Sequence, residues 1–298
     1  MLGALSYFLG IALLVSPVAL VAAPLALYLG LRPSSRRDLV AAAALALLAV
    51  LLCLGPADDY EQLERAWLLL LAGALAVTLL AGGSRRFPAS AFVALGGAGA
   101  AAGALMAATS LTWTKVARIA EHHFFPAFRS WINLVAPVGN PGRETVNDTM
   151  MSVLHGLSQF VPGLVLLQTF AALALAWALY HRLARRPEGE PLGTLASFRF
   201  NDHAIWGVAI ALLVLVLPRL PWSRALGGNL LVFFGGLYLV RGVAVLVALA
   251  AAVGLGSVII LLLTVFLWPV VGAAALALGL TDTLVDWRLR LARAAGKP

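Results

Sequence analysis

The residue best placed to do chemistry in this sequence is Arg241, which lies in the middle of the apolar run of residues 230–253. A run of this length predicts a bilayer-spanning helix, and a charge at its centre costs about 2.5–3.5 kcal/mol on insertion scales. Arg241 would lie about 17 Å from each end of the run, too deep for its side chain to reach either interface. We therefore expect the guanidinium to face protein or water rather than lipid.

Other polar residues lie near the ends of apolar runs and could join Arg241 in a buried polar cluster or a ligand site. Asp282 is the first candidate for a direct partner of Arg241, ahead of Gln168 and Asp202, although Asp202 could also serve as a helix cap. A guanidinium in a dry cavity binds carboxylate or phosphate groups well, so the expected ligand is a small anionic solute. The complete candidate set is Arg241, Asn229, Tyr238, Asp282, Gln168 and Asp202.

Sequence motifs for catalysis and for nucleotide binding are missing. Neither Lys115 nor Lys297, the two lysines, has the glycine-rich context of a phosphate-binding loop. The single cysteine, Cys53, excludes an intrachain disulfide and a cysteine-based metal site, and His122 and His123 lack the H-E-x-x-H order. We therefore expect no enzyme activity, no cofactor and no metal site.

The composition requires membrane helices to carry these residues. Hydrophobic residues make up 62% of the 298 residues and charged residues 11%, with a mean hydropathy of +0.95, whereas soluble domains have about 25% charged residues. The predicted fold is an all-α polytopic transmembrane bundle in a single membrane domain over residues 1–298, because each helix satisfies its own backbone. Eight apolar runs are candidate spans, of which six to eight are expected to cross: residues 5–31, 39–54, 66–81, 89–108, 161–180, 204–217, 230–253 and 258–280.

The charges of the connections predict the orientation. Arginines mark residues 36–37, 85–86 and 182–186, whereas residues 58–64 are acidic, so the arginine connections are expected in the cytoplasm and the acidic one outside. Eight spans would place the basic tail, residues 288–297, outside, against the charge rule. Either the tail is an exception or one candidate after Arg186 does not fully cross. The second is favoured, and residues 204–217 form the weakest candidate. The formal charge of +8 is spread over the connections, which favours contact with anionic lipid headgroups over nucleic acid.

Residues 110–152 form the one long polar connection and are predicted to be an interfacial amphipathic and loop region. From Trp113 to Trp131 apolar residues recur every three or four positions. This spacing predicts an amphipathic helix in the headgroup region, interrupted at Pro126; a helix packed across the ends of the spans is the open alternative. Residues 137–148 are predicted to be an exposed loop.

Small residues predict two helix-packing faces. Gly99 and Gly103 form a GxxxG pair, for which packing inside the protein is expected ahead of a partner interface. Ala22 and Ala26 form a similar step in the first apolar run.

Three blocks near the end of the chain resemble the YybS-like family of bacterial multispanning membrane proteins, a domain of unknown function. These blocks are FRFNDHAIWG (198–207), NLLVFFGGLYLVRGVAV (229–245) and LGLTDTLVDWR (278–288). The resemblance implies a multi-pass protein of the bacterial cytoplasmic (inner) membrane. The family is remotely similar to the substrate-binding S components of energy-coupling-factor transporters, which carry no ATPase motif and dock to a coupling membrane protein through small-residue helix faces.

Two functions are favoured by the sequence, ahead of an intramembrane enzyme, for which it shows no recognisable nucleophile, dyad or metal set. One is a substrate-binding transport component without its own ATPase, with the polar set around Arg241 as its site. The other is a non-transporting membrane scaffold or assembly factor, in which Arg241 makes a structural buried pair and the helix at residues 113–131 contacts partner proteins.

Overall fold

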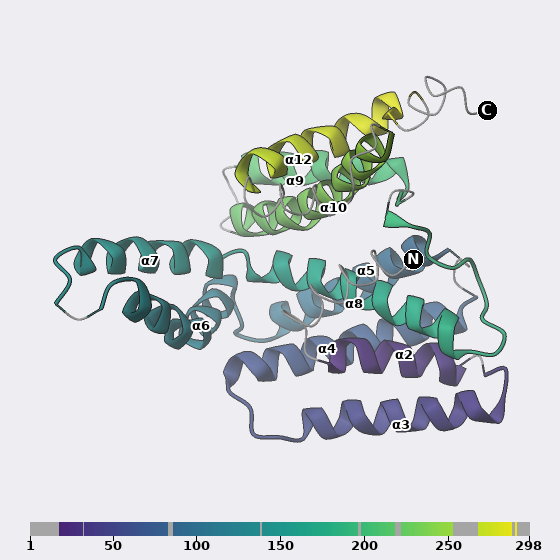
Figure 1. Cartoon of the computed structure of the whole chain (residues 1–298). Coiled ribbons are helices and arrows are strands. Elements are labelled where there is room, and N and C mark those ends of the chain that lie inside the picture. Colours follow the sequence, from purple (N-terminus) through teal and green to yellow (C-terminus); the bar gives the residue numbers. More distant parts are fainter. Residues whose placement is uncertain are drawn as a thin grey trace. The chain divides into compact units, whose positions relative to one another are not determined.

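The structure is a computed structural model that describes residues 18–31, 33–82, 86–137, 139–195, 198–217, 222–252, 268–287 and 290. Over these residues it contains helices and their connections and no β-strand, which confirms the all-α class (Figure 1). The described residues belong to two compact units, a larger one within Phe8–Pro191 and a smaller one within Leu192–Pro298. The single membrane domain predicted for the whole chain stays a prediction.

The larger unit is built around α2. Its helices are α2 (Ala19–Leu31), α3 (Arg36–Cys53), α4 (Asp59–Leu80), α5 (Phe87–Ala108), α6 (Trp113–Val135), α7 (Arg143–Ser158) and α8 (Val161–Leu183). α2 packs against α3, α4 and α8, and it continues through Pro24. Ala22 and Ala26 are buried in this unit, so their small side chains face protein here.

Among the described residues, the glycine pair of α5 packs against no other helix. A Cβ added to Gly99 or Gly103 would meet no described atom within 4 Å. The buried face of α5 is formed instead by Ala91, Ala94 and Ala98, which recur at three- and four-residue steps. The packing expected at the GxxxG pair is therefore not seen among the residues that the structure describes.

The arginine-rich connections of the larger unit meet at one end of it, and the acidic connection before α4 lies at the other end. At one end, the Arg186 backbone N–H donates to Ser34 Oγ (3.2 Å), and Arg86 Nε lies 3.9 Å from Glu190 Oε2. These contacts join the connections before α3, before α5 and after α8. At the other end, Asp58 caps α4 with Glu61 in a capping box, and its carboxylate lies 2.6 Å from His123 of α6.

The α6–α7 hairpin extends away from the other helices of the larger unit (Figure 1). α6 packs on the unit through Ala120, which is buried with Tyr60 and Val161. Two expectations for this region were wrong. α6 is not interrupted at Pro126, because a helix can pass through a proline when its other hydrogen bonds and its packing are kept, and residues 143–148 are helical because α7 begins at Arg143.

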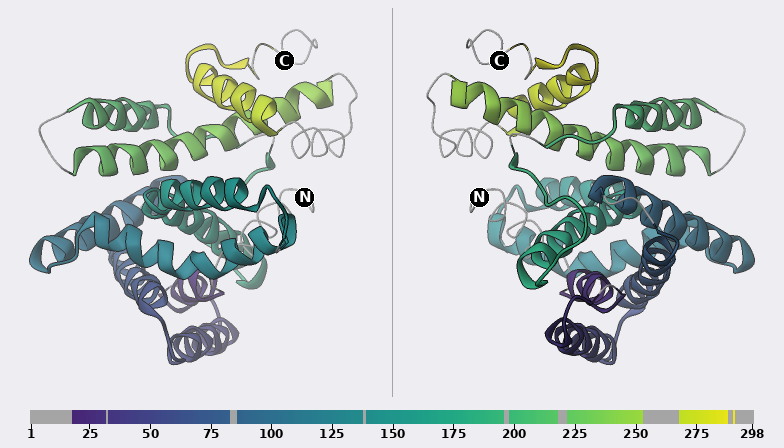
Figure 2. Two further views of the ribbon diagram at one scale, coloured as in Figure 1. Left: turned by 90° about the vertical axis from the view of Figure 1, so that its left-hand side faces the viewer. Right: turned by 90° about the vertical axis from the view of Figure 1, so that its right-hand side faces the viewer.

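The smaller unit consists of the 3₁₀ turn η2 (Asp202–Ala204), α9 (Ile205–Val216), α10 (Ser223–Ala252) and α12 (Trp268–Val285). α10 is its longest described helix, with α9 along its first half and α12 crossing its second half (Figure 2). Glycines permit both contacts. A Cβ at Gly227 would lie 2.9 Å from the Ala211 carbonyl oxygen of α9, and a Cβ at Gly242 would overlap the Ala275 carbonyl of α12.

Four described helices are long and apolar enough to cross a membrane: Asp59–Leu80, Phe87–Ala108, Val161–Leu183 and Ser223–Ala250. Shorter apolar helices lie at Ala19–Leu31, Asp202–Val216 and Val270–Val285. These elements match the predicted runs closely, with two exceptions. Residues 5–17 and 258–267 lie outside the described residues, and α4 and α10, which begin at Asp59 and Ser223, each start seven residues before the predicted run.

Candidate functional site

Arg241 lies in the second half of the described part of α10. It is about 27 Å from Ser223, where the helix begins, and about 17 Å from Ala252, the last residue of the helix that the structure describes. The expected position of Arg241 in the middle of a membrane span stays a prediction, because Ser223 and Arg224 precede the apolar run of residues 230–253 and the structure describes this run only as far as Ala252.

The Arg241 side chain is fully buried and binds two carboxylates of the smaller unit. Its Nε donates to Asp282 Oδ2 (2.9 Å) and its Nη1 donates to Asp202 Oδ1 (2.8 Å). Arg241 is 0% exposed and Asp282 is 1% exposed, whereas 43% of the Asp202 side chain is exposed. The two contacts join α10 to α12 and to the turn before α9, as expected for a buried arginine with partners from other segments.

The network continues outward through a second arginine. Arg199 donates through Nη2 to Asp202 Oδ2 (3.1 Å) and through Nη1 to Asp286 Oδ2 (2.8 Å). Asp202 thus bridges the two guanidinium groups. We call the series Asp282, Arg241, Asp202, Arg199 and Asp286 the ion-pair chain; it leads from a buried pair to side chains that are one third to nearly one half exposed.

Local structure places each member of the ion-pair chain. The Asn201 side chain accepts from the His203 N–H (3.0 Å), which caps the 3₁₀ turn that begins at Asp202. Asp282 Oδ1 accepts from the Trp287 N–H (3.1 Å), and Asp286 has a φ of 45° at the end of α12. A Cβ at Gly279 would overlap the Tyr238 carbonyl, so the glycine lets α12 approach α10 closely.

Aromatic rings cover the Arg241 guanidinium. Its central carbon lies 5.5 Å from the centroid of the Phe200 ring, within the range of a cation–π contact. The Phe200 ring meets the Tyr238 ring edge to face at 5.1 Å between centroids. The apolar cover keeps the local dielectric constant low, which strengthens the ion pairs beneath it.

The ion-pair chain itself carries a formal charge of −1, from three aspartates and two arginines. Partial burial raises the pKa of Asp202, but its hydrogen bonds to Arg241 and Arg199 outweigh this effect, so the pKa is lowered overall. For Arg199, burial opposes the charged form, but the Asp202 and Asp286 carboxylates raise its pKa overall. Both shifts favour the ionised forms of Asp202 and Arg199.

Arg241 Nη2 is a buried donor with no hydrogen-bond partner among the described residues, and the buried hydroxyls of Tyr238 and Thr283 beside the ion-pair chain have no described partner except each other. An unpaired buried donor costs free energy comparable to a lost hydrogen bond, and such atoms are commonly satisfied by ordered water or a bound ligand. The site therefore has hydrogen-bonding capacity left over, although its charges are already paired.

Two members of the predicted set lie elsewhere. Asn229 is buried on α10 about 18 Å along the helix from Arg241, and its Nδ2 donates to the Ala225 carbonyl (2.8 Å). Gln168 lies on α8 in the larger unit. The set predicted from the sequence lacks Arg199, Phe200 and Asp286; the signal for Arg199 is that it lies three residues before Asp202.

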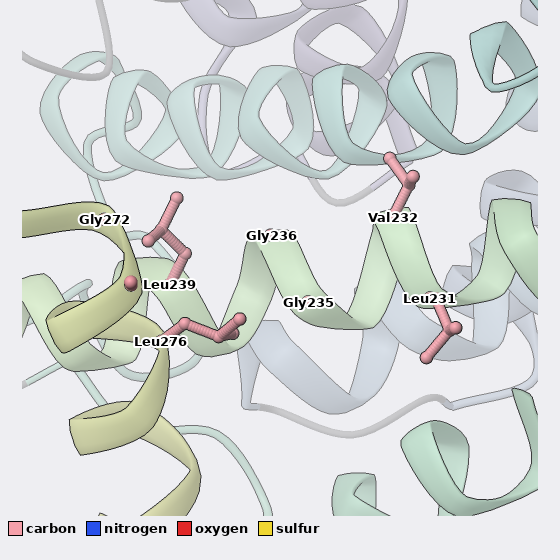
Figure 3. A pocket seen from close by; sticks show the side chains of 8 residues that line it. Leu231, Val232, Gly235, Gly236, Leu239, Gly272 and Leu276 are labelled. Atoms are coloured by element: carbon pink, nitrogen blue, oxygen red, sulfur yellow. The ribbon is translucent and has the colours of Figure 1, made fainter. Parts of the chain in front are cut away.

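A shallow apolar groove of about 320 Å³ runs between α10 and α12 (Figure 3). It is lined by Leu231, Val232, Gly235, Gly236, Leu239, Gly272, Ala273 and Leu276, none of which belongs to the ion-pair chain. Among the described residues no group of three or more His, Cys, Asp or Glu side chains is arranged to hold a metal ion. The groove and the ion-pair chain are separate features of the smaller unit.

The apolar helices and the buried ion-pair chain define the class as a polytopic helical membrane protein. The model of the family described as "Predicted membrane protein (DUF2232)" matches residues 3–283, and the chain belongs to this family. No curated protein and no solved structure matches the chain. The family description supports a membrane protein of unknown function; the finer resemblance to the YybS-like family and to S components stays a prediction.

Proposed function

We propose that this protein is a non-transporting scaffold or assembly component of the bacterial cytoplasmic membrane. The observation that carries the proposal is that Arg241 is 0% exposed and already binds Asp282 and Asp202. A solute site for anions needs positive charge that the protein leaves unpaired, and the ion-pair chain carries a formal charge of −1. The arginine expected to bind an anionic solute instead connects three segments of the smaller unit.

The α6–α7 hairpin supports the same proposal from the larger unit. On α6, Trp131, Leu134 and Val135 are exposed at three- and four-residue steps, on the stripe that buries Ala120 nearer the bundle. A continuous stripe that is buried at one end and exposed at the other suits contact with a partner membrane protein.

The experiment compares the two functions directly. Small molecules that co-purify with the wild-type protein are identified by mass spectrometry and compared with those of an Arg241→Leu/Asp282→Asn variant. In parallel, a photo-crosslinking amino acid replaces Leu134 in the native membrane, with exposed Leu69 of α4 as the matched control. We expect a discrete protein adduct at position 134 alone and no solute that depends on Arg241. A small molecule bound by the wild type and lost from the double variant would overturn the scaffold proposal.

A transport component is the second candidate, because Arg241 Nη2 has no hydrogen-bond partner among the described residues and the Tyr238 and Thr283 hydroxyls near the ion-pair chain have only each other. These atoms favour a neutral polar solute over an anion, since the Arg241 charge is already neutralised. In the same experiment, a Tyr238→Phe/Thr283→Val variant should release such a solute while the ion-pair chain is kept.

A further inference from the structure

We propose that the arginine-rich end of the larger unit is a binding surface for the headgroups of anionic phospholipids. This surface, here the basic end, consists of Arg36, Arg37, Arg86, Arg182, Arg185 and Arg186. The proposal does not depend on the scaffold role, since it concerns different residues.

Folding gathers these arginines from three separate connections. Arg36 and Arg37 begin α3, Arg86 precedes α5, and Arg182 lies in the last turn of α8. The contact of the Arg186 N–H with Ser34 Oγ brings the segment after α8 to the start of α3, and the Arg86–Glu190 contact brings it to the start of α5. Connections separated by up to about 150 residues therefore present their charges together.

The basic end has an excess of positive charge. Its described acidic neighbours are Asp38, Glu188 and Glu190, which leaves a formal charge of +3 against the six arginines. Asp38 is 3% exposed and bonds to both Ser34 Oγ and Ser35 Oγ, so its carboxylate is held inside the turn. The side chains of Arg86 and Glu190 are 77% and 73% exposed, and such an exposed pair is weak enough for a phosphate to compete with it.

The neighbourhood of the arginines indicates a lipid rather than a free phosphate. α5 and α8 are long and apolar enough to cross a membrane, so the arginines at their ends lie where the helices leave the hydrocarbon. Exposed Leu39 and Val40 follow Arg36 and Arg37 on α3, and exposed Leu183 follows Arg182. A ligand with a phosphate beside an acyl chain matches this pairing, and guanidinium groups bind phosphate through parallel hydrogen bonds.

The test uses the full-length purified protein in mixed micelles, with native mass spectrometry of bound phosphatidylglycerol against phosphatidylcholine. Arg36→Gln/Arg37→Gln is compared with Arg118→Gln/Arg129→Gln, a matched pair of exposed arginines on α6. The change at α3 should not unfold the helix, because cations at a helix N-terminus oppose the macrodipole. Each arginine removed from the basic end should lower the preference for phosphatidylglycerol about fivefold at low ionic strength, and the control pair should change it less than twofold.

In a second arm of the experiment, inorganic phosphate is added at the same concentration as the lipid headgroups. In a third arm, the Arg36→Lys/Arg37→Lys variant is measured in the same way. We expect phosphate to displace little lipid, because it lacks the acyl chain, and the lysine pair to keep most of the preference through its charge. Equal losses in the basic-end and control pairs would overturn the proposal. Full displacement of the lipid by inorganic phosphate would also overturn it, because it would indicate a site for free anions.

Discussion

Removing the Arg241 side chain should destabilise the smaller unit far more than removing Arg199, although both arginines belong to the ion-pair chain. Arg241→Leu takes the arginine from Asp282, which is 1% exposed and cannot hydrate in place. Breaking a buried pair in this way costs about 3–5 kcal/mol. Asp202 adds little to this loss, because 43% of its side chain is exposed and it keeps its contact with Arg199.

The double variant Arg241→Leu/Asp282→Asn separates the cost of a stranded charge from the cost of lost packing. Asparagine at position 282 carries no charge and can still accept from the Trp287 N–H through its side-chain oxygen. The double variant should therefore lose only about 1–2 kcal/mol, so the second change recovers about 2 kcal/mol or more. Arg199→Leu is the matched control, and with a side chain 45% exposed it should cost under about 1 kcal/mol.

The assay is reversible unfolding of the purified protein in mixed micelles by titration with a denaturing detergent, followed by circular dichroism. Free energies of unfolding are compared for the wild type, the two single arginine variants, Asp282→Asn and the double variant. If Arg241→Leu costs no more than Arg199→Leu, or if the losses of Arg241→Leu and Asp282→Asn simply add, the buried charge pair does not connect these helices as we infer.

Three further predictions concern acid stability, helix packing and orientation. Hydrogen bonds from the Glu61 backbone N–H and the His123 side chain lower the pKa of Asp58 in the folded protein. The Asp58 carboxylate therefore stabilises the fold above its unfolded pKa of about 3.9. This stabilisation is lost as the pH falls through the pKa of Asp58 in the folded protein. Asp58→Asn should therefore flatten the acid limb of a stability–pH profile, and an unchanged limb would count against this. Gly242→Ala should lower the free energy of unfolding by about 1–3 kcal/mol in the same assay, because the added Cβ would meet the Ala275 carbonyl. Gly235→Ala is the control and should not destabilise the protein, because the space around Gly235 is open. Equal losses for the two variants would contradict the packing of α12 on α10. In a Cys53→Ala background, a cysteine at exposed position 59 should be labelled from outside and one at exposed position 187 from the cytoplasm. Reversed labelling would refute the orientation.

The sequence predicted the helices well because apolar runs in a membrane protein follow from the cost of exposing backbone and polar groups to lipid. The runs at residues 89–108 and 161–180 correspond to α5 and α8 within three residues at each end. The sequence-based prediction of the start of α10 was wrong, because Ser223 and Arg224 belong to the helix although they precede the apolar run. Hydropathy finds the part of a helix that lies in lipid, whereas the ends of the helix depend on capping and packing.

The composition alone determined that the chain is a helical membrane protein, and the isolated charge of Arg241 determined that this residue needs a polar partner. Which partner it has was decided by the tertiary structure. Asp282 and Asp202 are 41 and 39 residues from Arg241 along the chain, and they reach it because glycines let α12 cross α10 in close contact and because a 3₁₀ turn precedes α9. Asn229, on the same helix as Arg241, lies apart from the ion-pair chain, because position along a helix fixes depth and direction while side-chain contacts depend on neighbouring helices.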